Sequence, residues 1–124
     1  MKRDMELVRK ILFAIEKQYV DTAINNLKIE GYSTEEIAYH CKILYEAELI
    51  SEYEARYADG RIFRYFVGPL TWEGHDYLDK IRSDTVWNKT KETIKNKGLP
   101  MIIDVIKEIA SAIIGSMITG ALNS

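Results

Sequence analysis

The sequence predicts an α+β fold that is mainly α, with one short hairpin and three helices after it. Three observations support this prediction. Apolar residues recur at helical spacing near the N-terminus, two alternating aromatic runs flank an Asp-Gly turn, and residues 109–124 carry no charge. A length of 124 residues is enough for one domain with a core and an appendage.

The N-terminal third predicts a helix, a short strand and a second helix. Residues 3–18 place apolar side chains on one helical face, and residues 27–30 predict a short strand. Ser33 and Glu36 have the spacing of a capping box, which satisfies free amides at a helix start. We therefore expect a helix over 34–48. Its inward residues are Ile37, Cys41, Leu44 and Ala47, and its outward residues include Tyr39 and His40.

Residues 52–57 and 62–67 alternate around Ala58-Asp59-Gly60, which predicts a β-hairpin. Thr71 is expected to cap another helix, with Trp72, Leu78 and Ile81 on its apolar side. Helix, strand, helix, two-stranded wing and helix follow one another as in a winged helix-turn-helix. We assign residues 1–83 to this domain.

The remaining sequence predicts two further segments. Residues 84–98 indicate a basic amphipathic helix or linker, which Gly98 and Pro100 end. Residues 99–124 indicate an apolar C-terminal helix for membrane contact or oligomerisation.

Charge and cysteine usage narrow the class of protein. Residues 1–88 hold twelve Lys or Arg against sixteen Asp or Glu, so the domain lacks the overall basic character of a nucleic-acid binder. Cys41 is alone, and Asp4 and Glu6 interrupt the start where a signal peptide needs an apolar run. These features predict a cytoplasmic protein.

Four sequence blocks resemble a known family. The opening MKRDM, the stretch GYSTEEIAYHCKILYEAELI, the block LTWEGHDYLDKIR and the following VWNKTK are similar to small phage and prophage proteins catalogued as a domain of unknown function. The resemblance covers about residues 1–100 and implies a winged-helix fold and a phage-related setting, but no activity. Glu48 departs from the pattern, because winged helices usually have Gly there and a left-handed cap costs more without it.

The expected recognition helix does not suit DNA. Its outward residues include Glu35, Glu36 and Glu46, which would repel phosphate. The aromatic and arginine residues of the wing favour contact with a protein partner, and ordinary cross-strand pairing is the alternative. The expected partner-binding residues are Tyr39, Tyr53, Arg56, Tyr57, Arg61, Phe63, Arg64 and Tyr65.

The sequence contains no pattern that indicates catalysis. His40 and His75 lack partners at metal-ligand spacing, and no phosphate-binding loop or nucleophile motif occurs. We therefore expect no enzyme activity, metal site or cofactor.

The apolar surface of the C-terminal helix must be buried against lipid, against copies of itself or against its own domain. A helix over 101–122 would be about 33 Å long, close to the thickness of a bilayer core. Asp104, Lys107 and Glu108 leave its charge-free part shorter than a usual span. The residues expected to contact membrane or other copies are Ile102, Ile106, Ile109, Ala112, Ile113, Ile114, Gly115, Ser116, Met117, Ile118, Gly120 and Leu122.

Residues just before this helix resemble a membrane-interface segment. The expected interface residues are Trp87, Lys89, Lys91, Lys95 and Lys97. Together the features predict a sensor and effector for antiphage defence. Its wing binds a protein such as a phage component, and its tails assemble and permeabilise the inner membrane. The alternative is a prophage transcription regulator that binds DNA and dimerises through the C-terminal helix.

Overall fold

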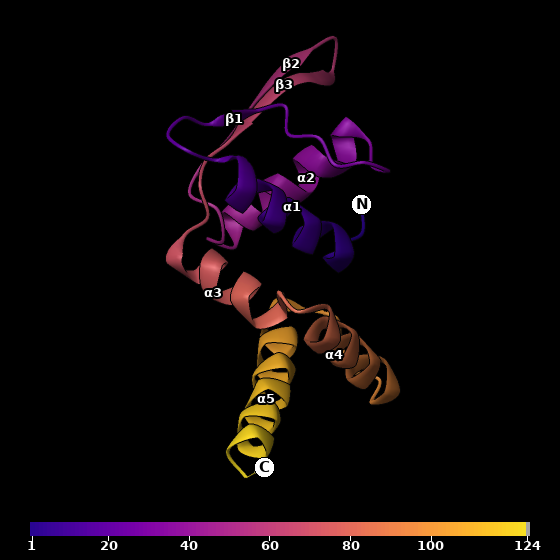
Figure 1. Ribbon diagram of the computed structural model, residues 1–124. Helices are drawn as coiled ribbons and strands as arrows, with labels where there is room; N and C mark the ends of the chain where they lie inside the picture. The colour runs from indigo at the N-terminus through magenta and orange to yellow at the C-terminus, as the bar shows by residue number, and fades with distance from the viewer. Residues whose placement is uncertain (124) are drawn as a thin grey trace. The chain divides into compact units, whose positions relative to one another are not determined.

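A computed structural model describes residues 1–123, which form two compact units, Met1–His75 and the described residues from Asp76 onward. Figure 1 shows the order of the elements along the chain. The described residues contain five helices and one three-stranded antiparallel sheet. The α+β, mainly α prediction is therefore confirmed. The division falls after His75, within a helix, whereas the sequence placed the domain end at residue 83.

The first unit begins with α1 (Met5–Gln18), whose start is capped by Asp4. The Asp4 carboxylate accepts hydrogen bonds from the amides of Glu6 and Leu7 at 3.0 and 3.1 Å. One face of α1 is buried throughout, as the apolar spacing predicts. The strand β1 (Ile24–Asn25) follows, so the prediction of a strand over 27–30 is wrong. Pairing with a distant strand fixes this position, and no local signal marks it.

Helix α2 (Thr34–Glu46) has the expected capping box at its start. At its end, Leu49 N–H donates to Leu44 O and Glu48 N–H donates to Tyr45 O. This is a Schellman motif, and Glu48 adopts the left-handed φ of 63° that it requires. The helix therefore ends before residue 48, and Ala47 is exposed rather than inward.

His40 was expected to face outward, but it is 2% exposed and joins α1 to α2. Its Nε2 accepts a hydrogen bond from Asp4 N–H at 2.8 Å, and its Nδ1 lies 2.7 Å from Glu36 O. Because Nε2 is an acceptor, Nδ1 carries the proton and donates to the carbonyl. The His40 side chain thus links the N-terminus of α1 to α2.

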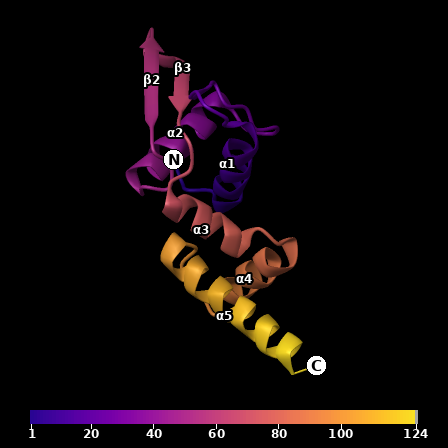
Figure 2. The same cartoon turned by 60° about the vertical axis from the view of Figure 1, so that its left-hand side comes forward.

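The hairpin consists of β2 (Tyr53–Ala58) and β3 (Arg61–Val67), and the sheet order is β1-β3-β2. Asp59 and Gly60 both have positive φ, of 54° and 76°, as a type I′ turn requires. Figure 2 shows the hairpin extending away from the helices of its unit, with β2 at the outer edge. The predicted hairpin is therefore present.

The relation to winged helices stays a prediction. The elements α1, β1, α2 and the hairpin follow in the expected order. However, residues 19–33, which include β1, separate α1 from α2, whereas a helix-turn-helix joins its helices by a turn of about three to four residues.

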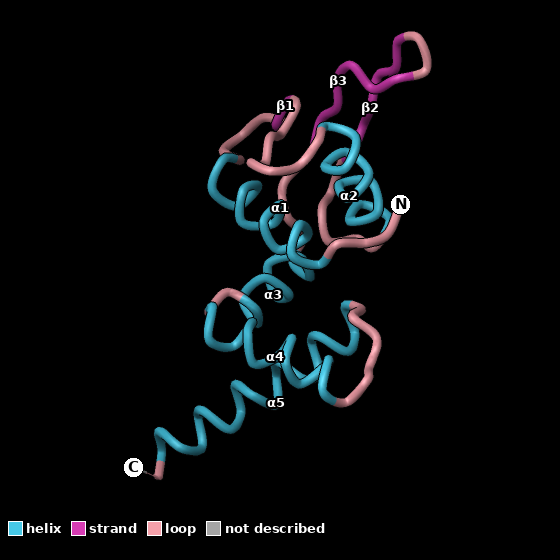
Figure 3. Tube along the Cα trace, turned by 90° about the vertical axis from the view of Figure 1, so that its right-hand side faces the viewer, coloured by secondary structure: helices cyan, strands magenta, loops and turns pink. Residues whose placement is uncertain are grey.

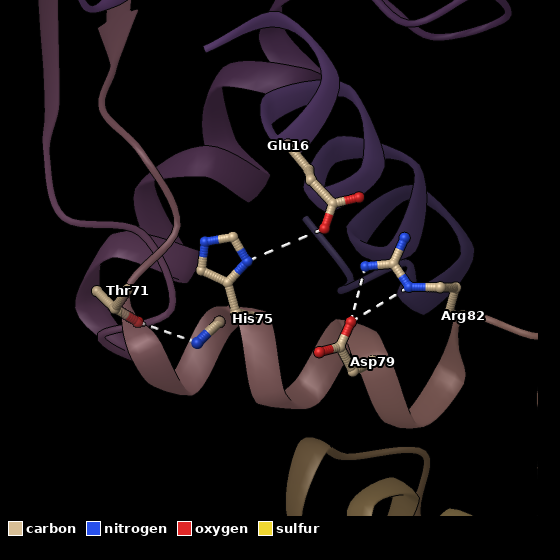
Figure 4. A network of polar contacts seen from close by, with 6 residues as sticks. Glu16, Thr71, His75, Asp79 and Arg82 are labelled. Atoms are coloured by element: carbon tan, nitrogen blue, oxygen red, sulfur yellow. Dashed lines mark hydrogen bonds and ion pairs between the residues drawn. The ribbon is translucent and has the colours of Figure 1, made fainter. Parts of the chain in front are cut away.

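Helix α3 (Trp72–Ile81) starts against the chain that leaves α2. Thr71 Oγ1 accepts from Gly74 N–H at 3.0 Å (Figure 4), which confirms the expected cap. It also donates to Glu48 O at 2.6 Å. Gly74 is required here, because a Cβ atom would lie 2.0 Å from the carbonyl oxygen of Leu49. Trp72 is 77% exposed, so its predicted place on the apolar side is wrong.

Figure 4 also shows two side-chain pairs near α3. His75 Nδ1 lies 3.9 Å from the carboxylate of Glu16 in the first unit. In the second unit, Arg82 binds Asp79 at 2.7 Å. Both pairs are partly exposed, so they contribute little to stability.

The second unit contains α4 (Asp84–Asn96) and α5 (Ile103–Leu122), which pack against each other (Figure 3). Ser83 caps α4, and Gly98, with φ of 64°, ends it through a second Schellman motif. The unit buries one face of each helix. Its buried side chains include Tyr77, Leu78, Ile81, Val86, Trp87, Ile94, Ile106 and Ala110.

Candidate binding surfaces

The hairpin presents most of the predicted partner-binding residues to solvent. Tyr57 and Phe63 are 63% and 57% exposed, and Arg56, Arg61 and Arg64 are exposed. Two further predicted residues, Tyr39 and Tyr53, are half-buried. Large exposed aromatic residues beside arginine are typical of protein interfaces.

Tyr65 does not belong to this surface, because it is fully buried. Its hydroxyl donates to the carbonyl of Leu27, and its amide donates to the side chain of Asn26. Burial raises the pKa of the Tyr65 phenol. The alternation of side chains along β3 could have predicted this burial, because Tyr65 lies on the same face of the sheet as the buried Val67.

A hollow of about 430 Å³ lies at the base of the hairpin. It brings together the predicted residues Tyr53 and Arg56. It also includes residues that the sequence reading missed. These are Ala23, Tyr45, Glu52, Glu54, Phe66 and Val67.

Carboxylates gather at the base of the hairpin, and arginines lie in its outer part. A second hollow of about 590 Å³ shares Tyr45 with the first and is lined by Glu46, Glu48 and Glu73. Glu52 and Glu54 add two carboxylates at the hairpin base. The base is therefore acidic. Arg56 lines the first hollow and binds Glu54 at 2.6 Å, and the outer part of the hairpin carries Arg61 and Arg64 against Asp59.

Helix α5 is the candidate membrane surface. It has 20 residues, of which an 18-residue stretch has a mean hydropathy of 1.5 and is 11% buried. By length and composition alone it is long enough to cross a membrane.

The predicted contact residues of α5 fall into three groups. Ile106 is buried, whereas Met117, Ile118 and Leu122 are 48%, 55% and 80% exposed. Half-buried positions are Ile102, Ile109, Ile113 and Ile114, and further exposed ones are Ala112, Gly115, Ser116 and Gly120. The first half of α5 thus packs within its unit, and the second half is open.

Only some of the predicted membrane-interface residues in and after α4 lie on the surface. Lys89, Lys95 and Lys97 are exposed and Lys91 is half-buried, but Trp87 is 2% exposed and lies in the core of the second unit. The ammonium of Lys91 lies 5.3 Å from the Trp87 ring centre. The interfacial position predicted for Trp87 is therefore wrong, because its ring packs inside.

A groove of about 530 Å³ runs between the end of α4 and the middle of α5. Its walls are mainly apolar, with Lys97 and Glu108 among the lining residues. The apolar lining residues are Leu99, Val105, Ile109, Ala112 and Ile113. Four predicted membrane or oligomer residues, including Ser116, thus line one groove.

Within residues 1–123, no group of three or more His, Cys, Asp or Glu side chains is placed to hold a metal ion. Burial raises the pKa of the Cys41 thiol to about 12, so this cysteine is a poor nucleophile at neutral pH.

Comparison with known proteins places the chain in a family. Residues 2–100 match the family model described as "Hypothetical protein (DUF2513)". An uncharacterised protein of Haemophilus influenzae is 40% identical over 121 residues, which cover 95% of this chain and 99% of the relative. The match with this relative therefore includes most of α5. No solved structure matches the chain. The chain belongs to the DUF2513 family.

Proposed function

We propose that this protein is a sensor and effector in which the first unit binds a protein partner and α5 then acts on a membrane. The observation that carries the proposal is the exposed second half of α5. Ile118 and Leu122 face solvent on a helix whose last fourteen residues, from Ile109 to Leu122, carry no charge. Covering a large aliphatic side chain is worth about 1.5–3 kcal/mol, so this surface favours lipid or another protein over water.

The position of the charges indicates insertion after assembly rather than a permanent anchor. Asp104, Lys107 and Glu108 occupy the first turns of α5, and the charge-free part spans only about 21 Å. This is shorter than the roughly 30 Å hydrocarbon core. Small residues at Ala112, Ser116 and Gly120 permit close approach of neighbouring helices. Assembled helices would place their charges in a shared wet interior.

The first unit supplies the sensor. Its exposed hairpin and the acidic base suit a protein partner, and the resemblance to phage and prophage proteins supports a phage component and antiphage defence. In this proposal the protein is cytoplasmic at rest and associates with the inner membrane when active. The partner must bind the released state more tightly than the resting state, since a ligand shifts an equilibrium only by differential affinity.

Vesicle flotation and dye leakage with the full chain test the membrane function. Ile118→Asp removes an exposed apolar side chain, and Ser111→Asp adds the same charge at an exposed position near Glu108. We expect Ile118→Asp to lose binding to anionic vesicles and Ser111→Asp to keep most of it. Equal behaviour of the two variants, or no leakage with the native chain, would contradict the proposal.

DNA binding by a prophage regulator is the second candidate, because Arg56, Arg61 and Arg64 are exposed on the hairpin. Glu35 and Glu46 on the exposed side of α2 oppose it. A gel shift that weakens with salt and disappears in Arg61→Ala/Arg64→Ala would favour this function over membrane action.

A further inference from the structure

The strand β2 has one unpaired edge with a defined pattern of backbone groups. Gly68 N–H donates to Glu52 O, and the register pairs Glu54 with Phe66 and Arg56 with Arg64. In an antiparallel ladder, alternate residues direct both backbone polar groups to the partner strand. Tyr53 and Ala55 therefore direct theirs outward, away from β3, which Figure 2 shows beside β2.

The charges along β2 are self-complementary under a two-fold rotation. If the axis passes through Ala55, the strand of a second copy runs antiparallel and Glu54 lies opposite Arg56 of that copy. The same rotation sets Arg56 opposite Glu54 of the copy, and opposite charges across strands are favourable. Ala55 is the smallest side chain near this axis, so the two strands approach without obstruction.

The wider charge distribution fits the same rotation. The acidic base of one hairpin, with Glu52 and Glu54, would lie beside the outer part of the other, whose Arg61 and Arg64 stand one strand further away, on β3. Within one chain, Arg56 lies opposite Arg64, an unfavourable like-charge pair, and binds the carboxylate of Glu54 at 2.6 Å. A carboxylate from a second copy would lie next to Arg56 on the same face of the extended sheet.

The aromatic residues support the same register. Tyr57, 63% exposed in one chain, falls opposite Tyr53 of the second copy. Tyr53 lines the hollow at the hairpin base, which leaves room beside it. Residues 53, 55 and 57 share one side-chain direction, so aromatic pairs flank the alanine at the axis.

We propose that two copies of this chain form a two-fold dimer through antiparallel pairing of their β2 strands, centred on Ala55. The pairing joins two three-stranded sheets into one and leaves the outer part of β3, with Phe63, open to another partner. This dimer goes beyond the membrane function, because it uses no residue of α5.

Charge exchange provides the test, with the full chain in analytical ultracentrifugation. Glu54→Arg or Arg56→Glu alone would place like charges opposite each other and weaken association roughly tenfold or more. A mixture of the two single variants restores both opposite-charge pairs, and so does the double variant Glu54→Arg/Arg56→Glu. Glu92→Lys, on the exposed side of α4, is the charge control and should associate as the native chain does.

A cross-link checks the register independently of affinity. Ala55→Cys places two thiols at the axis, where paired Cα atoms lie about 5.5 Å apart, within disulfide range. Glu52→Cys has no thiol opposite it in this register and should not cross-link.

Native association in both single variants, or failure of the mixture and of the folded double variant to associate, would overturn the dimer. Association through α5 would be the same in all charge variants. Vesicle binding reports on α5 alone, so the two proposals fail separately.

Discussion

Replacing Gly74 by alanine tests the close approach between the start of α3 and the chain leaving α2. The added Cβ would lie 2.0 Å from Leu49 O, and ordinary contact begins at 3.4 Å, so the two backbones must separate by about 1.4 Å. The obstructing atoms belong to the backbone and have no side-chain torsion that could move them away. Helix propensity alone predicts the opposite sign, a gain of up to ~1 kcal/mol for alanine over glycine.

The cost follows from the contacts that this separation breaks. Overpacking costs about 1–3 kcal/mol. Thr71 N–H donates to Leu49 O at 3.0 Å and Thr71 Oγ1 donates to Glu48 O, and each bond is worth ~1 kcal/mol. After the propensity gain, we expect a net loss of about 2–4 kcal/mol.

Urea unfolding followed by far-ultraviolet circular dichroism measures this loss. The matched control is Gly115→Ala in α5, where an added Cβ meets nothing within 4 Å. The control should keep its stability or gain up to ~1 kcal/mol. If Gly74→Ala were as stable as the native chain, the steric argument would be refuted.

Three further predictions concern helix ends and buried ionisable groups. Glu48→Gly should raise the free energy of unfolding by ~1 kcal/mol, and Gly98→Ala should lower it by ~1 kcal/mol, because both positions have left-handed φ. Urea unfolding measures both changes, and changes of the same sign in the two variants would contradict this prediction. Cys41, with its pKa raised to about 12 by burial, should react with a disulfide reagent at pH 8 only after denaturation. Burial raises the pKa of the Tyr65 and Tyr77 phenols, so their protonated forms favour the folded state. This contribution to folding stability is complete below about pH 10, the pKa of tyrosine in an unfolded chain, and is lost as the pH rises through the pKa values of the folded chain. Absorbance at about 295 nm should show these two tyrosines ionising together with unfolding, and titration of all tyrosines in the folded chain would refute the assignment.

Local signals in the sequence were sufficient where a few neighbouring residues decide the structure. The capping box of Ser33 and Glu36, the Asp59-Gly60 turn and the Gly98 helix end are all present as expected. Each depends on backbone amides or φ angles within a few residues.

Features set by distant partners were not predictable in the same way. His40 is buried because it binds Asp4, 36 residues earlier in the chain. The strand β1 lies where Ile24 and Asn25 pair with Val67 and Phe66. The exposed hairpin residues were found because alternation is local. The acidic base was missed because Glu52 and Glu73, which are distant in the sequence, line two hollows that share Tyr45.

The unequal burial of α5 predicts unequal protection of its amides from hydrogen exchange. Near Ile106 and Ala110, opening the helix exposes packed apolar surface, so exchange there should be slow. Beyond Gly115 the helix has no such support, and glycine and β-branched residues disfavour it in water. Amide exchange should be fast at this end in dilute solution and slow once lipid or another helix covers it. The exchange rates along α5 therefore show whether its C-terminal half is bound.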